Sequence, residues 1–188
     1  MNQNLIQTFT RSEVEAALKQ IHPTKAPGPD GMFAIFFQKY WNVVGNDITC
    51  MVLNVLNRNM SMSSINKTSI TLVPKINNPS KMTNFRPISL SNVVYKLVAK
   101  VLANRLKVLL PHIISENQSA FLSERFISNN VLVAFELMHY LEHKKEGKEN
   151  FMAVKLDMSK AYDRLEWGFI ERVMEKMGFH EKWISLIM

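Results

Sequence analysis

A long apolar pattern at helical spacing constrains this sequence more than any other feature. Apolar residues recur at steps of three and four from Val94 to Leu110, and the pattern stops at Pro111. Residues at these steps share one face of a helix, so the pattern predicts an amphipathic helix capped by Ser91 or Asn92. The chain has 188 residues, of which 47% are apolar and 21% charged. It is therefore long enough for one ordinary folded domain and unlike a disordered chain.

Shorter patterns predict further helices and a few scattered strands. The capping box Thr10-Arg11-Ser12-Glu13 begins a helix that ends before Pro23. Other helices are expected at about 32–44 and 47–59 (joined at Gly45), at 129–145, at 167–177 (stopped by Gly178), and from 181 onward. Strands are expected at 68–73, 85–90 and 151–156. The predicted fold class is α+β and helix-dominated, with an incomplete sheet.

Two local features complete this prediction. The segment Lys25-Ala-Pro-Gly-Pro-Asp-Gly31 holds two prolines and two glycines, which predicts a loop with fixed turns. The aromatic residues that follow at helical spacing favour a core-facing stripe over a base-stacking platform; they are Phe33, Phe36, Phe37, Tyr40 and Trp41.

Cysteine content and hydropathy limit the class of protein. Cys50 is the single cysteine, which excludes an internal disulfide framework and a cysteine-rich zinc site, and we expect it to be a small buried residue. The longest apolar runs are shorter than a membrane-spanning helix, and the N-terminus lacks the layout of a signal peptide. We therefore expect an intracellular protein, nuclear or cytoplasmic and not secreted, with no membrane partner.

Charge is segregated along the chain, whose formal net charge is +7. No acidic residue lies between Asp47 and Glu116. The basic residues of that segment are Arg58, Lys67, Lys75, Lys81, Arg86, Lys96, Lys100, Arg105 and Lys107. A run with one sign of charge is typical of a protein that binds a polyanion. It is equally compatible with a solvated helix face whose lysines meet carboxylates from elsewhere in the fold.

Asp157 is the main candidate for a site residue, because it follows the predicted strand 151–156. The ends of strands hold side chains rigidly and leave them open to solvent. A carboxylate there could bind Mg²⁺, which prefers oxygen ligands. The alternative is an aspartate that caps the next turn. We expect Asp163 to have a structural role, paired with Arg164 or a neighbouring lysine.

Six ordered blocks resemble the reverse transcriptase of plant LINE-type non-LTR retrotransposons, and they cover most of the chain from about Thr10 onward. The blocks are Lys25-Ala-Pro-Gly-Pro-Asp-Gly31, Ile70-Thr-Leu-Val-Pro-Lys75, Phe85-Arg-Pro-Ile-Ser-Leu90, Lys100-Val-Leu-Ala-Asn-Arg-Leu-Lys107, Gln118-Ser-Ala-Phe121 and Lys155-Leu-Asp-Met-Ser-Lys-Ala-Tyr-Asp163. The resemblance implies a right-hand polymerase fold, of which this chain would be an N-terminal fragment with the fingers and part of the palm. The expected division is an N-terminal helix in 1–23, a fingers-like region in 24–150 and the start of the palm in 151–188.

The resemblance also implies partners and residue roles. The partners would be an RNA template, a DNA primer and deoxynucleoside triphosphates, in a two-metal nucleotidyl transfer that uses Mg²⁺. Asp157 matches the first catalytic aspartate and metal ligand, and the Met158 carbonyl is the usual second oxygen. Tyr162 matches the residue whose ring lies under the incoming sugar and excludes a 2′-hydroxyl. The remaining nucleotide contacts would be Arg86, Lys75 and Lys96. The template contacts would be Gln118, Arg125, Lys100 and Lys107.

The sequence departs from the family in two respects. Glu124 and Asn129 occupy positions where the family commonly has Gly and Asp. In addition, no Tyr-x-Asp-Asp, the hairpin motif that supplies the other catalytic carboxylates, occurs in these 188 residues. One aspartate and one carbonyl cannot hold two Mg²⁺ ions about 4 Å apart, so we expect this chain alone to be inactive.

Three hypotheses follow. The first is a truncated RNA-directed DNA polymerase that needs further sequence for activity. The second is a non-catalytic RNA-binding remnant that keeps the basic fingers. The third is a relic that never folds stably, because an unfinished sheet exposes apolar edges.

Overall fold

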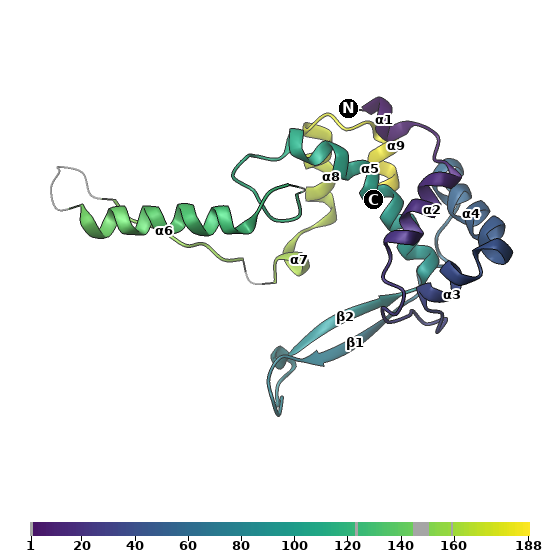
Figure 1. Cartoon of the computed structure of the whole chain (residues 1–188), viewed down its shortest axis with the longest axis horizontal. Helices are drawn as coiled ribbons and strands as arrows, with labels where there is room; N and C mark the ends of the chain where they lie inside the picture. The colour runs from purple at the N-terminus through teal and green to yellow at the C-terminus, as the bar shows by residue number, and fades with distance from the viewer. Residues whose placement is uncertain (1, 123, 145–150, 159) are drawn as a thin grey trace. The chain divides into compact units, whose positions relative to one another are not determined.

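The computed structural model describes residues 2–122, 124–144, 151–158 and 160–188, and the side chains of Tyr162 and Asp163 lie outside this description. It is helix-dominated with a small two-stranded sheet (Figure 1). The chain divides into two units, one of residues 3–105 and one of residues 106–188 with the first two residues.

The first unit is built on helices close to the predicted places, apart from the short N-terminal helix, which the sequence did not predict. They are the end of α1 (Asn2–Ile6), α2 (Arg11–Gln20), α3 (Ala34–Lys39), α4 (Trp41–Arg58) and most of α5 (Val93–Ile113). The predicted start of α2 is confirmed, because the backbone N–H of Thr10 donates to Glu13 Oε2 at 2.8 Å. The long central pattern is confirmed as α5, which buries Leu97, Val98 and Val101.

Two predictions about the middle helices were wrong in detail. The break between α3 and α4 falls at Tyr40, and Gly45 lies inside α4. A Cβ on Gly45 would lie 2.8 Å from the Trp41 ring, so glycine makes room for the indole. The aromatic stripe is core-facing in part, because Phe37 is buried whereas Phe33 and Tyr40 are exposed.

Arg105 ties the start of the first unit to α5. Its guanidinium donates to both carboxylate oxygens of Glu13, at 2.6 and 2.9 Å, and to the backbone carbonyls of Leu5, Gln7 and Thr8. It also lies 3.5 Å from the centre of the Phe9 ring. Arg105 is therefore an internal structural residue, not a free charge of the basic segment.

The predicted strands at 68–73 and 85–90 are confirmed as an antiparallel hairpin of β1 (Thr68–Pro74) and β2 (Phe85–Ser91). The register pairs Thr68 with Ser91 and Pro74 with Phe85, and a short 3-10 helix, Met82–Asn84, precedes β2. Every residue of β1 is exposed. Figure 1 shows the hairpin projecting away from α2, α3 and α4.

The second unit contains α6 (Ile127–His143), α7 (Ala161–Arg164), α8 (Trp167–Lys176) and α9 (Glu181–Ile187). No residue of α6 is buried. Gly178 ends α8 as predicted, with φ +77°, and its carbonyl accepts a hydrogen bond from the Asn2 side chain at 2.8 Å. Pro111 does not stop α5, which runs on to Ile113. Proline removes one N–H donor, but the Ile114 N–H still donates to the Leu110 carbonyl at 3.0 Å, so the last turn is kept.

The predicted strand at 151–156 was wrong. Residues 151–158 have no regular secondary structure, and Phe151, Met152, Val154 and Leu156 are exposed. A strand persists when a neighbouring strand pairs its backbone N–H and C=O groups. Among the described residues no strand pairs with this segment.

Candidate functional site

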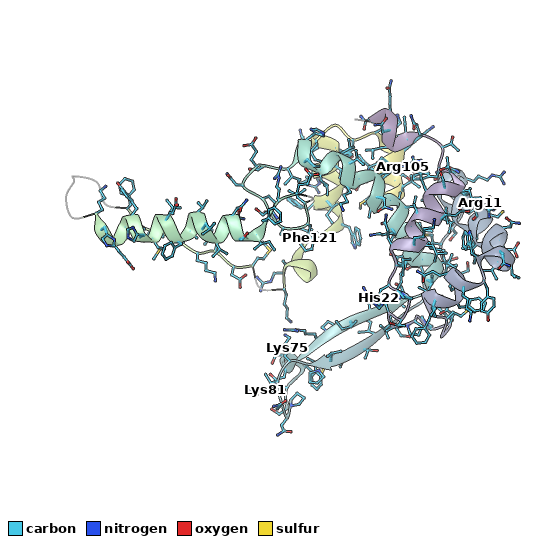
Figure 2. All side chains as sticks on the ribbon, viewed as in Figure 1. Arg11, His22, Lys75, Lys81, Arg105 and Phe121 are labelled. Carbon is cyan, nitrogen blue, oxygen red and sulfur yellow. The ribbon has the colours of Figure 1, made fainter. Side chains whose placement is uncertain are left out.

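The hairpin carries two of the predicted site residues close to its end. Arg86 in β2 is paired with Val73 of β1, and Lys75 directly follows Pro74, the last residue of β1. Both side chains are exposed. The Lys75 ammonium donates to the Thr83 carbonyl at 3.1 Å. Figure 2 shows Lys75 and Lys81 near the end of the hairpin, so positive charge gathers there without a nearby carboxylate in the sequence.

Lys96 fastens the glycine–proline loop to the start of α5. Its ammonium donates to the Ala26 carbonyl at 2.9 Å, and the Asn92 side chain accepts from the Asp30 N–H at 3.4 Å. A Cβ on Gly28 would lie 2.3 to 2.5 Å from atoms of Asn92 and Ser91, so the loop fits only with glycine there.

Electrostatics at this junction favour a counter-anion. Burial lowers the pKa of Lys96 below its ordinary value, and the nearby charge of Lys25 lowers it further, whereas Asp30 opposes the shift. Lys25 thus belongs to the same cluster of charge, although the sequence prediction did not include it. Lys25 begins the first of the six sequence blocks, and this position could have identified it as a site residue.

The remaining predicted template contacts are split between the units. Lys100 is half-buried in the first unit, and Lys107 is exposed on the part of α5 that belongs to the second. Gln118 is exposed in the loop after α5, and its side-chain amide donates to the Ala120 carbonyl at 3.4 Å.

Arg125 organises that same loop. Its guanidinium donates to the carbonyls of Ser115 at 2.6 Å and Gln118 at 2.8 Å, with longer contacts to Pro111 and Ile114. Glu124, just before it, adopts φ +65°. This left-handed backbone suits glycine, which accounts for the residue that the resemblance led us to expect there.

Asp157 and Met158 lie in the irregular segment 151–158, and both are exposed. The backbone of Tyr162 lies in α7, but its side chain and that of Asp163 are outside the described structure, so the predicted pairing of Asp163 stays a prediction. Asp157 belongs to the second unit and Arg86 to the first.

The donor set for a metal ion is small. Among the described residues, no group of three or more His, Cys, Asp or Glu side chains could hold a metal ion. Asp157 and the adjacent Met158 carbonyl offer oxygen ligands suited to Mg²⁺, which usually takes one or two carboxylates and completes its shell with water or phosphate. Among the described residues, these two oxygens suit a single Mg²⁺ ion.

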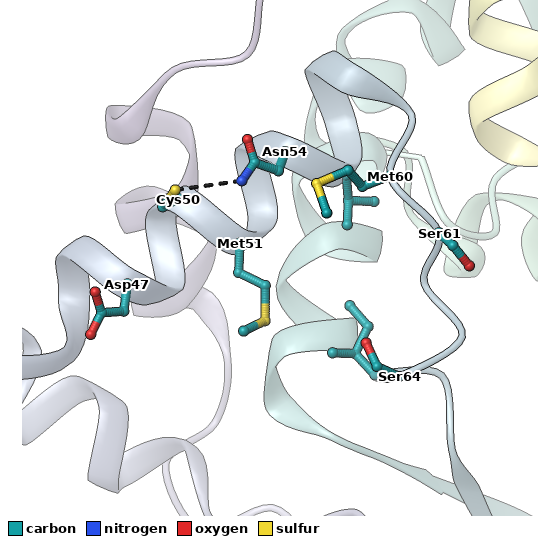
Figure 3. Close-up of a pocket in the computed structure, with 9 residues that line it drawn as sticks. Asp47, Cys50, Met51, Asn54, Met60, Ser61 and Ser64 are labelled. Carbon is teal, nitrogen blue, oxygen red and sulfur yellow. Dashed lines mark hydrogen bonds between the residues drawn. The ribbon is translucent and has the colours of Figure 1, made fainter.

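A separate pocket in the first unit lies between α4 and the loop that follows it (Figure 3). It has a volume of about 390 Å³, and the lining residues include Asp47, Cys50, Met51 and Met60. The expectation that Cys50 is buried was wrong, because its side chain is exposed and accepts a hydrogen bond from the Asn54 amide at 3.5 Å. The apolar face of α4 turns Val52 and Leu56 inward and leaves Cys50 outside.

No helix in the described part of the chain is long and apolar enough to cross a membrane.

Comparison with known proteins gives a consistent result. Residues 66–188 match the family described as "Reverse transcriptase (RNA-dependent DNA polymerase)". The chain is 28% identical over 179 residues to the "Transposon TX1 uncharacterized 149 kDa protein" of Xenopus laevis, covering 95% of this chain and 14% of that protein. It is 24% identical over 177 residues to the "Retrovirus-related Pol polyprotein from type-1 retrotransposable element R2" of Popillia japonica, covering 92% of this chain and 23% of that protein. The chain thus spans less than a quarter of the length of either relative.

Proposed function

Because this chain belongs to the reverse transcriptase family, in the form found in non-LTR retrotransposons, we propose that it supplies the fingers and the first palm segment of an RNA-directed DNA polymerase. Its partners are an RNA template, a DNA primer and deoxynucleoside triphosphates. The observation that carries the proposal is the family match over residues 66–188, which includes the basic hairpin and the block around Asp157. The six sequence blocks further favour a LINE-type element of plants.

The nucleotide contacts come from cations of the first unit. Arg86 and Lys75 both lie near the end of the hairpin, where fixed positive charge stabilises the charge that develops on a transferred phosphoryl group. Lys96 uses one donor hydrogen on the Ala26 carbonyl and keeps two for a phosphate, since an ammonium has three. Lys25 adds a second cation at that junction.

The template contacts combine charge and loop shape. Lys100 and Lys107 offer ammonium groups to the RNA backbone, and Gln118 offers an amide from the loop that follows α5. Arg125 contributes by holding the carbonyls of Ser115 and Gln118, which fixes the form of that loop.

Asp157 and the Met158 carbonyl would hold Mg²⁺ in the complete enzyme, where the ion supplies Lewis-acid activation of the attacking 3′-hydroxyl and the triphosphate. By the family resemblance, Tyr162 would exclude a ribonucleotide, whose 2′-hydroxyl would overlap an aromatic ring at that position. These 188 residues contain no Tyr-x-Asp-Asp, so the second ion lacks its carboxylates and the chain alone does not polymerise. Loss of such electrostatic stabilisation costs about 3–4 kcal/mol per element, or a hundredfold or more in rate.

Primer extension tests this proposal. The purified chain should give no templated DNA synthesis, and a chain extended with downstream sequence that carries the missing hairpin should give Mg²⁺-dependent synthesis. In the extended chain, Asp157→Asn should abolish synthesis while leaving RNA binding unchanged, with Asp47→Asn as a matched control. Synthesis by the 188 residues alone, or by extended Asp157→Asn, would contradict the proposal.

A second candidate is a non-catalytic RNA-binding remnant, which the exposed hairpin cations and the single carboxylate of segment 151–158 favour. Under this hypothesis no downstream sequence restores synthesis. Neutralising Arg86, Lys96 and Lys100 should weaken RNA binding. The slope of log affinity against log salt should flatten by about 0.7 for each phosphate of a single strand that the altered chain no longer neutralises.

A further inference from the structure

Phe121 presents an aromatic ring to solvent from an anchored loop. Its side chain is 87% exposed, whereas Ser119 and Leu122 on either side of it are buried. Figure 2 labels Phe121 in the loop between α5 and α6. The flanking residues therefore fix the backbone while the ring stays free.

Hydrogen bonds hold this loop in one form. Besides the contacts of Arg125, the Ser119 hydroxyl donates to the Asn130 side chain at 2.9 Å, and the Asn130 amide donates to the Asn117 carbonyl at 3.3 Å. Hydrogen bonds to Arg125 thus hold the loop's own carbonyls together, and hydrogen bonds to Asn130 connect the loop to the start of α6. An aromatic residue on such a loop loses little further freedom when a ligand contacts it.

The backbone of Phe121 is strained. Its φ of +65° lies in the left-handed region, which costs free energy for any residue with a Cβ and is common for glycine. A loop that needed only to turn here would be more stable with glycine or asparagine. Strain of this kind persists where the surroundings fix it, and it concentrates at binding sites.

We propose that Phe121 is a stacking platform for a nucleobase of the single-stranded RNA template. This inference rests on the proposed function and adds a base contact to the phosphate contacts assigned above. The ring offers a planar face, which stacks on any base without sequence preference. Gln118 in the same loop is exposed, and its amide, which has two N–H donors, uses one on the Ala120 carbonyl and keeps another for a polar ligand group.

The test measures binding of the 188-residue chain to two probes, a single-stranded oligoadenylate and an RNA of the same length without bases. Phe121→Ala should weaken oligoadenylate binding roughly five- to 150-fold and leave binding of the abasic RNA unchanged. Its salt slope should equal that of the unaltered chain, because no charge is removed. Phe121→Trp should retain binding, and Phe121→Leu should behave as Phe121→Ala, since leucine is apolar without a planar face.

Three results would overturn the inference. Unchanged oligoadenylate binding by Phe121→Ala shows that the ring makes no contact with the RNA. Oligoadenylate binding by Phe121→Leu equal to that of the unaltered chain shows that position 121 makes an apolar contact and not a stacking contact. A leucine would also suffice if the natural ligand of this position were an apolar protein segment. Equal weakening for the abasic RNA shows a change in the loop as a whole. In each case the proposed function survives, whereas failure of the unaltered chain to bind either RNA would remove both.

Discussion

Helices α4 and α6 are similar in length but differ completely in burial. The first, of 18 residues, buries Val52, Val55 and Leu56, and the second, of 17 residues, buries nothing. Yet α6 is the more apolar of the two, with Val131, Leu132, Val133, Phe135 and Leu137 all exposed. Apolar residues around a whole helix are typical of one buried on several sides. Both sequences form a helix, but the packing of neighbouring elements determines which side chains of each helix are buried.

The same contrast separates the two units. Most buried apolar side chains lie between Leu5 and Leu102, in the first unit, where Arg105 links α5 to the N-terminal segment. The unit of residues 106–188 buries fewer, among them Leu109, Met174 and Trp183, and exposes α6 and segment 151–158. Large exposed apolar surfaces mark interaction sites or places of aggregation. The first unit therefore has the core expected of a stable scaffold, whereas the second leaves more apolar surface exposed.

A pair of phenylalanine substitutions should give the largest difference between the units. Phe37 is 4% exposed and Phe135 is 68% exposed. Phe37→Ala should lower the free energy of unfolding by about 3–5 kcal/mol, because it leaves a cavity. Phe135→Ala should change it by about 0.5 kcal/mol or less, since the exposed ring packs against little and alanine favours helices. Urea denaturation followed by circular dichroism measures both, and equal losses would show that α6 is packed after all.

The Arg105 interactions come next in size. The Arg105 side chain is 11% exposed and that of Glu13 is 30% exposed. Arg105→Met should cost about 3 kcal/mol, because Glu13 and three carbonyls lose their donor. The control is Arg11→Met, which removes an exposed ion pair with Glu15 and should have a much smaller effect. If Arg105→Met leaves the free energy of unfolding unchanged in the same urea titration, Arg105 does not stabilise the first unit.

Two glycine substitutions should change stability in opposite directions. Gly28→Ala should destabilise the first unit by about 1–3 kcal/mol, because the new methyl group would overlap the backbone of Ser91 and Asn92. Gly168→Ala in α8 meets nothing within 4 Å and should stabilise the chain by about 0.5 kcal/mol. Thermal melting of the two variants measures the difference. Melting temperatures that rise together would contradict the packing of the glycine–proline loop on α5.

Relief of strain in the loop after α5 is a smaller effect. Glu124→Gly should raise the free energy of unfolding by about 0.5–1 kcal/mol, because glycine adopts φ +65° without a Cβ penalty. Glu124→Ala keeps the penalty and serves as the control. If both variants gain equally, charge rather than backbone conformation explains the change.

The smallest predicted effect is a loss of folding stability at low pH that depends on Glu13. Burial alone would raise the pKa of Glu13, but hydrogen bonds from Arg105 and Thr10 outweigh it and hold the pKa below the ordinary value of 4.5. A carboxyl with a depressed pKa in the folded state stabilises the fold above about pH 4.5, and this contribution is lost as the pH falls through the folded-state value. Urea midpoints between pH 6 and pH 3 should therefore fall less in Glu13→Gln than in the unaltered chain. Parallel curves would contradict the linkage.

The sequence predicted the local elements well where local physics decides them. The capping box, the hairpin strands and the α5 pattern need interactions only within a few residues or across one turn, and each appears as expected. Prediction from the sequence was less successful where residues far apart in the chain determine the conformation or the burial of a side chain. Cys50 could face inward or outward on α4, and segment 151–156 could be a strand only beside another strand.

The candidate site follows the same rule. The family resemblance identified Asp157, Arg86 and Lys96 as residues of interest, because the chemistry of phosphate and metal binding restricts residue types. The charge run also included Arg105, yet the fold uses that guanidinium to bind Glu13 and backbone carbonyls. Phe121 was a member of a motif without an assigned role until the structure showed its exposure and φ angle.

By itself, then, the order of residues determined the family, the helix and strand periods and the segregation of charge, since these depend on residue type and spacing along the chain. The tertiary structure alone decided which cations are free and which are internal, and which apolar faces are covered. Those outcomes depend on distances between residues far apart in the chain, such as the ion pair of Arg105 with Glu13, and no local pattern encodes such a distance.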